Sequence, residues 1–326
     1  MTTQSVLSVE SLTVEFNTSQ GNFQAVRNVS FELKEGEILG IVGESGCGKS
    51  VTSLSVMGLL PKRISKITDG HIYFQEQDLV KLKPKQLRKI RGKDISMVFQ
   101  EPMTSLNPVY TIGDQIGRII KNHEKDISRK EVEARVVELL KQVGIPRPDE
   151  IKDEYPHQLS GGMRQRVMIA MAISCNPKVL IADEPTTALD VTIQAQILEL
   201  LKKLTEERKM SLILITHDLG VVAEMCDRVL VMYSGQVVEK ADKEEFFTNP
   251  KHPYSKGLLA SIPEIGKRDQ DLHYIKGNVP HPSKEINGCR YQERCEFFFE
   301  KCLEGPKLLQ LKNGSCRCWL YEEEEV

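Results

Sequence analysis

A glycine-rich loop near the N-terminus constrains the fold of this chain more than any other stretch. Residues 43–50 read Gly-Glu-Ser-Gly-Cys-Gly-Lys-Ser and fit the phosphate-binding pattern G-x-x-x-x-G-K-[ST]. The apolar run 38–42 precedes the loop, and apolar residues at helical spacing follow it, which predicts a strand, a loop and a helix in that order. Glycines let backbone N–H groups turn toward phosphate oxygens, and a helix N-terminus favours an anion. The stretch therefore predicts an α/β fold that binds a nucleotide.

The side chains of the loop predict how the nucleotide would be held. Lys49 would place a positive charge beside the β- and γ-phosphates, and the Ser50 hydroxyl would bind Mg²⁺. A chance glycine-rich turn before a structural helix is the alternative, but every fixed position of the pattern is present. The residues expected to line the site are Gly43, Glu44, Ser45, Gly46, Cys47, Gly48, Lys49, Ser50 and Val51.

Composition and charge narrow the class of protein. The chain has 326 residues, 40% hydrophobic and 28% charged, which allows a sizeable core in one large domain or two. Its net charge of −2 offers no positive field for nucleic acid. The sequence has no apolar run long enough to span a bilayer, and its first residues lack the segments of a signal peptide. We therefore expect a cytosolic protein that reaches a membrane only through a partner.

Three apolar strands downstream of the loop each lead into polar side chains. One ends in Asp183 and Glu184, where the first carboxylate suits the outer coordination shell of Mg²⁺ and the second can orient and deprotonate a water. Another ends in Gln100, whose amide oxygen could bind Mg²⁺ or hold a water, and the breaker-rich residues 101–108 after it predict a loop. A third leads to His217, which could hydrogen-bond a γ-phosphate. A lone histidine is more often structural, but ligands bind outside the carboxyl ends of parallel strands, and this position of His217 favours the binding role.

The flanking segments predict two further pieces of structure. Residues 5–35 alternate apolar and polar in short runs, which predicts antiparallel strands. Phe16 lies in this region and could stack on a nucleobase, with Phe23 as the competing candidate. Residues 101–175, roughly, become helical in pattern, with a capping box at 128–131, and predict an inserted helical subdomain.

A second glycine-containing segment has the same physical character as the loop. Ser160, Gly161 and Gly162 precede a predicted helix, so unpaired N–H groups at its N-terminus could bind a phosphate. An ordinary serine cap on a core helix explains the same residues. The residues alone do not choose between these interpretations.

Five of the eight cysteines crowd into the C-terminal tail, at positions 289, 295, 302, 316 and 318. In a reducing compartment such a group is more typical of a metal site than of disulfides. The spacing lacks a C-x₂-C pair and fits common zinc ribbons poorly, whereas iron–sulfur clusters tolerate looser spacing. We expect the site to staple a small lobe that is too short for a core of its own.

Together these motifs make residues 5–240 resemble the ATP-binding subunits of ABC transporters. The Walker A motif is the loop at 43–50, the signature is Leu159-Ser-Gly-Gly-Met163, and the D-loop ends at Asp190. The family often has Gln where this chain has Met163. The resemblance implies an α/β P-loop NTPase core with a mostly parallel sheet, an N-terminal antiparallel β subdomain, an inserted α-helical subdomain and a small Cys-rich C-terminal extension. The implied division is an ATPase domain at 1–245 and an extension at 246–326.

The resemblance also implies a role for each site residue. Gln100 would sense Mg²⁺ and the attacking water, Glu184 would be the general base, and His217 would contact the γ-phosphate of ATP. Ser160 and Gly162 would bind the γ-phosphate of the ATP held by the opposite subunit.

Two segments, 99–108 and 249–254, are similar to those of dipeptide and oligopeptide importers. This implies a subunit that powers peptide uptake with a second ATPase subunit, two membrane permease subunits and an extracytoplasmic peptide-binding protein. The helical subdomain and the loop at 100–108 would dock on the permeases. Nickel importers belong to the same subfamily, so a metal substrate is the alternative.

The cysteine tail also resembles that of the peptide importers, whose last cysteine stands just before an aromatic residue. Cys318 precedes Trp319 and is therefore favoured over Cys316 as a ligand. The implied cofactor is a [4Fe–4S] cluster, with zinc as the alternative, and the implied ligands are Cys289, Cys295, Cys302 and Cys318.

Two other functions compete with transport. Some ABC ATPases act on ribosomes or DNA, but they usually carry two ATPase halves, a long charged linker or a coiled-coil insertion, and this chain shows a single half and a short insertion. A degenerate subunit that does not hydrolyse ATP is opposed by the intact Lys49, Asp183, Glu184 and His217.

Overall fold

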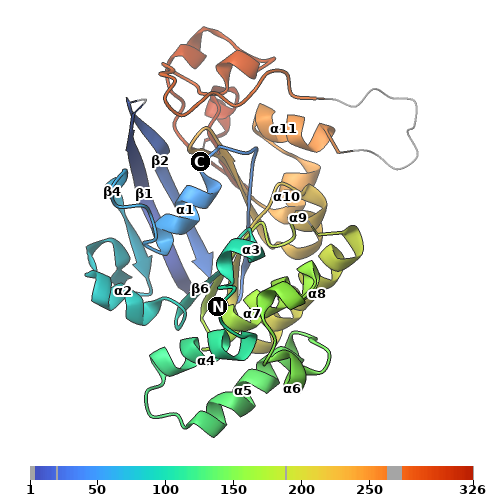
Figure 1. Ribbon diagram of the computed structural model, residues 1–326. Helices are drawn as coiled ribbons and strands as arrows, with labels where there is room; N and C mark the ends of the chain where they lie inside the picture. Colours follow the sequence, from blue (N-terminus) through green and yellow to red (C-terminus); the bar gives the residue numbers. More distant parts are fainter. Residues whose placement is uncertain (1–3, 20, 188, 263–273, 326) are drawn as a thin grey trace. The chain divides into compact units, whose positions relative to one another are not determined.

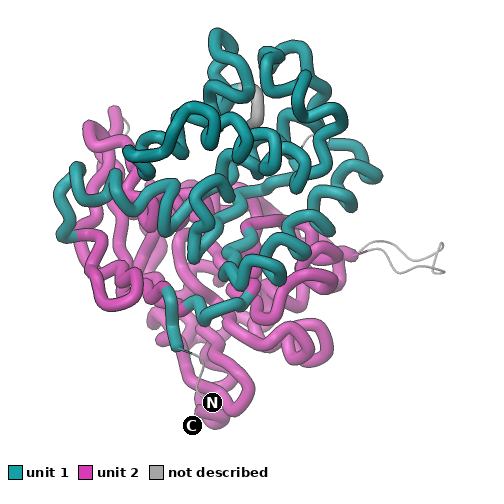
Figure 2. The backbone as a smooth tube through the Cα atoms, turned by 90° about the horizontal axis from the view of Figure 1, so that it is seen from below, with its two compact units in different colours: residues 1–6, 33–37, 81–214 teal, residues 7–32, 38–80, 215–326 magenta. Residues whose placement is uncertain are grey.

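A computed structural model of the protein describes residues 4–19, 21–187, 189–262 and 274–325. The chain divides into two compact units, coloured separately in Figure 2. Unit 1 contains residues 1–6, 33–37 and 81–214, and unit 2 contains residues 7–32, 38–80 and 215–326. Among the described residues, no helix has both the length and the apolar character needed to cross a membrane.

The N-terminal segment forms the predicted antiparallel strands, in a four-stranded sheet of order β2-β1-β4-β5. In the β1–β4 pair, Leu7 lies opposite Phe74 and Phe16 lies opposite Ser65. The short runs expected from the sequence merge into two strands of 14 residues each. The register of β1 shifts between Glu10 and Thr13, where Ser11 has φ +50°, so a bulge lets the strand continue through the break in alternation. The sheet contains β1 (Ser5–Thr18), β2 (Gly21–Lys34), β4 (Ser65–Phe74) and β5 (Gln77–Asp78).

A second sheet in unit 2 confirms the predicted strand, loop and helix around residues 43–50. Strand β3 (Ile38–Val42) is buried along its whole length, as expected for a strand covered on both faces. It runs parallel to β9 (Arg228–Tyr233), and helix α1 (Lys49–Val56) begins at the end of the loop. Antiparallel pairs continue the sheet from β9 through β10 (Gln236–Asp242) and β12 (Gly314–Cys316) to β11 (Leu309–Leu311).

The other regular elements among the described residues of unit 2 are helices and 3₁₀ turns. Helix α11 precedes the tail, which is drawn in orange and red in Figure 1. The elements are η1 (Leu79–Lys81, which ends in unit 1), α9 (Leu219–Met225), α10 (Lys243–Thr248), α11 (Pro253–Ala260), and the 3₁₀ turns η3 (Gln292–Arg294), η4 (Glu300–Leu303) and η5 (Trp319–Glu324).

Unit 1 combines buried strands with the predicted helical insertion. Strands β6 (Ile95–Val98) and β7 (Val179–Asp183) are parallel, and both are fully buried, as is β8 (Ser211–Ile215). Helix α7 is central to the insertion because it contacts α3, α4, α5, α8 and β6. The helices and turns of the unit are α2 (Pro84–Ile90), α3 (Pro102–Ser105), α4 (Ile112–His123), α5 (Arg129–Gln142), α6 (Pro148–Ile151), η2 (Pro156–Gln158), α7 (Gly161–Ile173) and α8 (Val191–Arg208).

One local prediction in unit 1 is confirmed and one is wrong. The Ser128 hydroxyl accepts the Glu131 N–H at 3.3 Å, and the Glu131 carboxylate accepts the Ser128 N–H at 2.9 Å, so the predicted capping box begins α5. The stretch 101–108 was expected to be a loop, but it contains the one-turn helix α3. Proline is tolerated in the first turn of a helix, and the hydroxyl of Ser105 donates to the carbonyl of Glu101 at 2.8 Å.

Candidate nucleotide-binding site

The phosphate-binding loop has a backbone that only glycine accommodates at its key positions. Gly43, Gly46 and Gly48 have φ angles of +149°, +81° and +97°. A Cβ atom on Gly43 would lie 2.2 Å from the carbonyl oxygen of Met232, and one on Gly48 would lie 2.8 Å from that of Ala25. The loop therefore lies tightly against neighbouring backbone of unit 2, and Gly43 and Gly48 are required by close approach as well as by φ, whereas Gly46 is required by φ alone.

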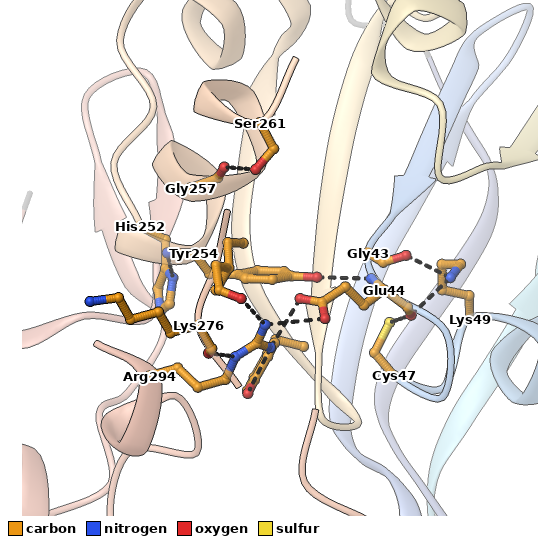
Figure 3. Close-up of polar contacts among 12 residues, drawn as sticks. Gly43, Glu44, Cys47, Lys49, His252, Tyr254, Gly257, Ser261, Lys276 and Arg294 are labelled. Carbon is orange, nitrogen blue, oxygen red and sulfur yellow. Dashed lines mark hydrogen bonds and ion pairs between the residues drawn. The ribbon is translucent and has the colours of Figure 1, made fainter. Parts of the chain in front are cut away.

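Lys49 lies at the start of α1 with its ammonium folded back over the loop. Its side chain is buried, and Nζ donates to the carbonyl of Gly43 at 2.7 Å and to that of Glu44 at 3.1 Å (Figure 3). These two contacts use two of the three hydrogens of an ammonium, which leaves donor capacity for a phosphate oxygen. The loop thus holds a positive charge where the nucleotide phosphates are predicted to bind.

Cys47 makes a hydrogen bond within the same loop. Its Sγ donates to the Glu44 carbonyl at 2.7 Å, and the side chain is fully buried. Burial raises the pKa of the Cys47 thiol to about 11, so the group is a neutral thiol at physiological pH. Its role here is to pack and to brace the loop.

At the acidic end of β7 in unit 1, side chains from residues far apart in the sequence are in contact. Asp183 ends the strand and is buried. Glu184 follows in a left-handed conformation, with φ +46°, which is unusual for a non-glycine residue and marks a constrained position. Its Oε2 accepts hydrogen bonds from Gln100 Nε2 and from Thr187 Oγ1, each at 3.0 Å. The two donors fix the position of the carboxylate, a group that can take a proton from a water.

Thr187 was missed by the sequence reasoning. The only signal for it was its place three residues after Glu184, which suits a side-chain contact once the chain turns. Gln100 and Glu184 were both predicted, but as separate strand ends with no contact between them.

Ser160 begins the glycine-containing segment and serves as a helix cap. Its hydroxyl accepts the N–H of Met163 at 3.3 Å at the start of α7. Ser160 and Gly161 are exposed, so the cap stands at an open helix end, and a Cβ on Gly162 would lie 2.8 Å from Ile193 Cγ2. The segment therefore has the cap geometry and also the accessibility that phosphate binding requires.

Asp190 and His217 lie beside other helix starts. Asp190 caps α8 by accepting the N–H of Ile193 at 3.0 Å, and Ala188 of the D-loop lies outside the described residues. His217 follows β8 and is exposed, and its neighbour Asp218 caps α9 by accepting the N–H of Gly220 at 2.8 Å. Their contacts with a nucleotide stay predictions.

Phe16 and Phe23, which were rival candidates for stacking on a base, stack on each other. Their ring centroids are 5.8 Å apart with an interplanar angle of 9°, and both side chains are half-buried. The ring of His281, from the C-terminal tail, meets Phe23 at 5.7 Å in an edge contact. The two phenylalanines form one aromatic platform, so a base stacked on either would involve both.

Four of the tail cysteines line one apolar cavity in unit 2, together with aromatic residues that include Tyr291 and Trp319. The described residues contain no group of three or more His, Cys, Asp or Glu placed to hold a metal ion, and the cysteines are free thiols. Burial raises the pKa of the Cys289 and Cys318 thiols to about 11, so without a metal they are protonated. Cys316 lies on β12, apart from the lining of this cavity. The lining cysteines are Cys289, Cys295, Cys302 and Cys318.

Comparisons with known proteins agree with this geometry. Residues 26–187 match the family described as ABC transporter, and residues 238–302 match the family described as oligopeptide/dipeptide transporter, C-terminal region. The oligopeptide transport ATP-binding protein AppD of Bacillus subtilis is 54% identical over 98% of each chain. The dipeptide transport ATP-binding protein DppD of Bacillus subtilis is 51% identical, over 98% of this chain and 96% of that protein.

Solved structures give the same family. The dimeric post-hydrolysis structure of the ATP-binding cassette MJ0796, bound to ADP and phosphate, aligns with a TM-score of 0.66 and 31% identity, over 73% of this chain and 98% of that one. The structure of cbiO1 from Clostridium perfringens, part of the ABC transporter complex cbiONQ, aligns with a TM-score of 0.62 at 31% identity, over 75% of this chain and 91% of that one. The phosphate loop, the glutamate held at the end of β7 and these matches together mean that the chain belongs to the ABC transporter ATPases, and to those that carry the oligopeptide/dipeptide transporter C-terminal region.

Proposed function

We propose that this ATPase powers the import of dipeptides or oligopeptides through a membrane permease. The observation that carries the proposal is the C-terminal match at residues 238–302, joined to near full-length similarity to peptide-transport ATP-binding proteins. A nickel importer of the same subfamily is the competing reading, and the substrate assay below separates the two.

The chemistry of the ATPase follows from the two groups of residues described above. Lys49 would contact the β- and γ-phosphates, and Ser50 and Asp183 are the residues that would hold Mg²⁺, which would offset the charge of the phosphates. Glu184 takes a proton from a water, whose oxygen attacks the γ-phosphorus while the bond to the β-phosphate oxygen breaks, giving ADP and phosphate. Gln100 keeps the Glu184 carboxylate in place and His217 contacts the γ-phosphate. The 3.0 Å bond between Gln100 and Glu184 supports the role of Gln100.

A second ATPase subunit, either the same chain or a homologous one, completes each site. The exposed Ser160 and Gly161, the neighbouring Gly162 and, from another segment, Asp190 would face the ATP held by the opposite subunit. The N-terminus of α7 supports this role, because its N–H groups and helix dipole favour a γ-phosphate. Closure of the two subunits on ATP would drive the permease between its inward- and outward-facing states.

A groove on unit 1 suits the docking of a permease subunit. Its lining includes Phe99, which is exposed, together with other apolar side chains and several basic ones. A permease segment with apolar residues flanked by acidic ones would match both features. Such docking would hold the protein at the cytoplasmic face of the membrane, and an extracytoplasmic binding protein would deliver peptide from the other side. The basic residues of the lining are Lys85, Arg88, Lys89, Arg91, Lys93 and Lys125.

We propose that residues 246–326 form an extension that holds a [4Fe–4S] cluster. The donor set fits in its chemistry, because four thiols line one apolar cavity and iron–sulfur clusters are held by four cysteine thiolates. The cluster would serve to hold the lobe together. The ligands would be Cys289, Cys295, Cys302 and Cys318.

Uptake measurements test the proposed substrate. Cells that lack this chain, complemented with the wild-type gene or with Glu184→Gln, are supplied with labelled dipeptide, labelled oligopeptide or radioactive nickel. We expect wild-type cells to accumulate peptide and Glu184→Gln cells to accumulate none. Nickel uptake without peptide uptake would refute the peptide assignment and support the nickel reading. Recovery of the protein with ribosomal RNA in place of membranes would refute transport altogether.

A further inference from the structure

The C-terminal part of unit 2 meets the phosphate loop at Glu44 (Figure 3). The hydroxyl of Tyr254 accepts a hydrogen bond from the Glu44 N–H at 2.8 Å. Arg294 donates through Nη1 to Glu44 Oε1 at 3.0 Å and through Nη2 to Oε2 at 3.2 Å. Two parallel bonds between an arginine and a carboxylate are the strong geometry for this pair. Glu44 is thus held at its backbone and at its carboxylate by residues 210 and 250 positions away in sequence.

Tyr254 is held rigidly in the first turn of α11. It is fully buried, and its own N–H donates to His252 Nδ1 at 3.0 Å. Its ring packs against Tyr233 at 4.7 Å and against Tyr291 at 5.5 Å between centroids. The carboxylate of Glu239 accepts the N–H of His252 at 2.8 Å, which fixes the helix start to β10. The hydroxyl that meets the loop therefore has little freedom to move.

Arg294 is placed by the cysteine-containing lobe. It is the last residue of η3, its side chain is only 5% exposed, and the next residue, Cys295, lines the cysteine cavity. Its Nε donates to the Lys276 carbonyl at 2.9 Å, and its guanidinium lies 5.6 Å from the ring of Tyr233. An arginine with this many partners is preorganised to hold a carboxylate.

Glu44 connects these contacts to the groups that bind phosphate. Its carbonyl oxygen accepts from Lys49 Nζ at 3.1 Å and from Cys47 Sγ at 2.7 Å. A shift of Glu44 would therefore move the ammonium that receives the β- and γ-phosphates. The Glu44 carboxylate also places a negative charge on the loop that receives an anion, and the Arg294 guanidinium offsets that charge.

We propose that Arg294 and Tyr254 are positioning residues for ATP, and that the C-terminal lobe (the extension at residues 246–326) tightens nucleotide binding through Glu44. The proposal rests on the ATP-binding role stated above and adds a function for the lobe in that role. Arg294 acts in two ways, since it fixes the loop and neutralises Glu44. Tyr254 acts by fixing the loop alone.

Binding of a fluorescent ATP analogue with Mg²⁺ tests the proposal. Arg294→Gln should weaken binding about tenfold, because the Glu44 carboxylate loses its charged partner beside the phosphate site. Adding Glu44→Gln to Arg294→Gln should restore most of that loss, because the unpaired charge is removed. Tyr254→Phe should weaken binding by a smaller factor. Arg317→Gln is the matched control, since Arg317 is an arginine of the same lobe that bonds the carbonyls of Val237 and Pro306, and it should leave binding unchanged.

The readouts distinguish positioning from a general loss of structure. Each variant is first compared with wild type by thermal unfolding, and Arg294→Lys, which keeps the charge but loses the fork, replaces Arg294→Gln if the latter does not fold. The KM for ATP should rise with little change in kcat. Unchanged binding in the Arg294 variants, or a double variant no better than Arg294→Gln alone, would overturn the proposal. A wild-type protein that binds ATP but supports no peptide uptake would refute the proposed import function and leave this inference standing.

Discussion

Alanine substitutions at Gly43 and Gly46 separate two costs in the phosphate-binding loop. Both glycines have positive φ, so either substitution strains the backbone. A Cβ on Gly46 would meet nothing within 4 Å, whereas one on Gly43 would lie 2.2 Å from the carbonyl oxygen of Met232 and 2.8 Å from Cys47 Sγ. Because both variants strain the backbone, the difference between their ATP affinities measures mainly the steric clash of the Gly43→Ala side chain with β9.

The structure sets the expected magnitudes. A side chain in a left-handed conformation costs roughly 1–2 kcal/mol, so Gly46→Ala should weaken ATP binding by at most about 5- to 30-fold. Gly43→Ala carries a comparable strain and also needs the loop to retreat by about 1 Å from Met232, and a misplacement of that size can cost about 100-fold in function. We expect ATP binding by Gly43→Ala to fall below detection while Gly46→Ala still binds.

The assay is titration of a fluorescent ATP analogue against wild type and both variants, with urea unfolding of each to measure the change in stability. Equal losses of affinity in the two variants would show that strain alone governs the loop. If Gly43→Ala binds the ATP analogue as tightly as wild type, the predicted clash with Met232 is wrong.

Three further predictions concern catalysis, thiol chemistry and metal content. Glu184→Gln should retain ATP and lose hydrolysis by about 100-fold or more, because the amide can accept the same hydrogen bonds but cannot take a proton; unchanged phosphate release would contradict the assigned base. Cys47, whose pKa is raised to about 11 by burial, should resist iodoacetamide at pH 8 in the folded protein and react after denaturation; equal labelling in both states, located by peptide mass, would contradict its burial. Cys318→Ser should lower bound iron measured by metal analysis with the visible spectrum, whereas Cys316→Ser should not; stoichiometric zinc without visible absorption would eliminate the cluster.

The sequence predicts the parts of this site whose chemistry lies within one short segment. The phosphate loop and the acids at the end of β7 were found because an apolar strand precedes each of them in the sequence. The helix at 102–105 was missed because a proline was counted as a breaker, although the first turn of a helix tolerates it. Phe16 and Phe23 were weighed as rivals because a single sequence gives no cross-strand geometry, and the structure stacks them together.

Contacts between distant segments could not be predicted in this way. Nothing local to Arg294 indicates that it pairs with Glu44, because the two lie 250 residues apart and neither belongs to a fixed position of a motif. The contact between Gln100 and Glu184, 84 residues apart, was open to inference only in principle, from the expectation that strand ends meet at one edge of a sheet. Single-sequence patterns therefore identify the reacting groups and leave out the residues that hold them.

Glu44 shows why the variable positions of the phosphate-binding pattern carry information of their own. The pattern fixes the glycines, the lysine and the hydroxyl because phosphate and Mg²⁺ chemistry is the same in every such loop. Position 44 is unconstrained by that chemistry, so its side chain is available to contact whatever the rest of the chain supplies. Here the chain supplies an arginine from the cysteine-containing lobe and a tyrosine from α11. Under our proposal, the C-terminal extension acts on nucleotide binding through position 44. The double variant Glu44→Arg/Arg294→Glu should keep an ion pair between these two positions while placing a positive charge on the loop.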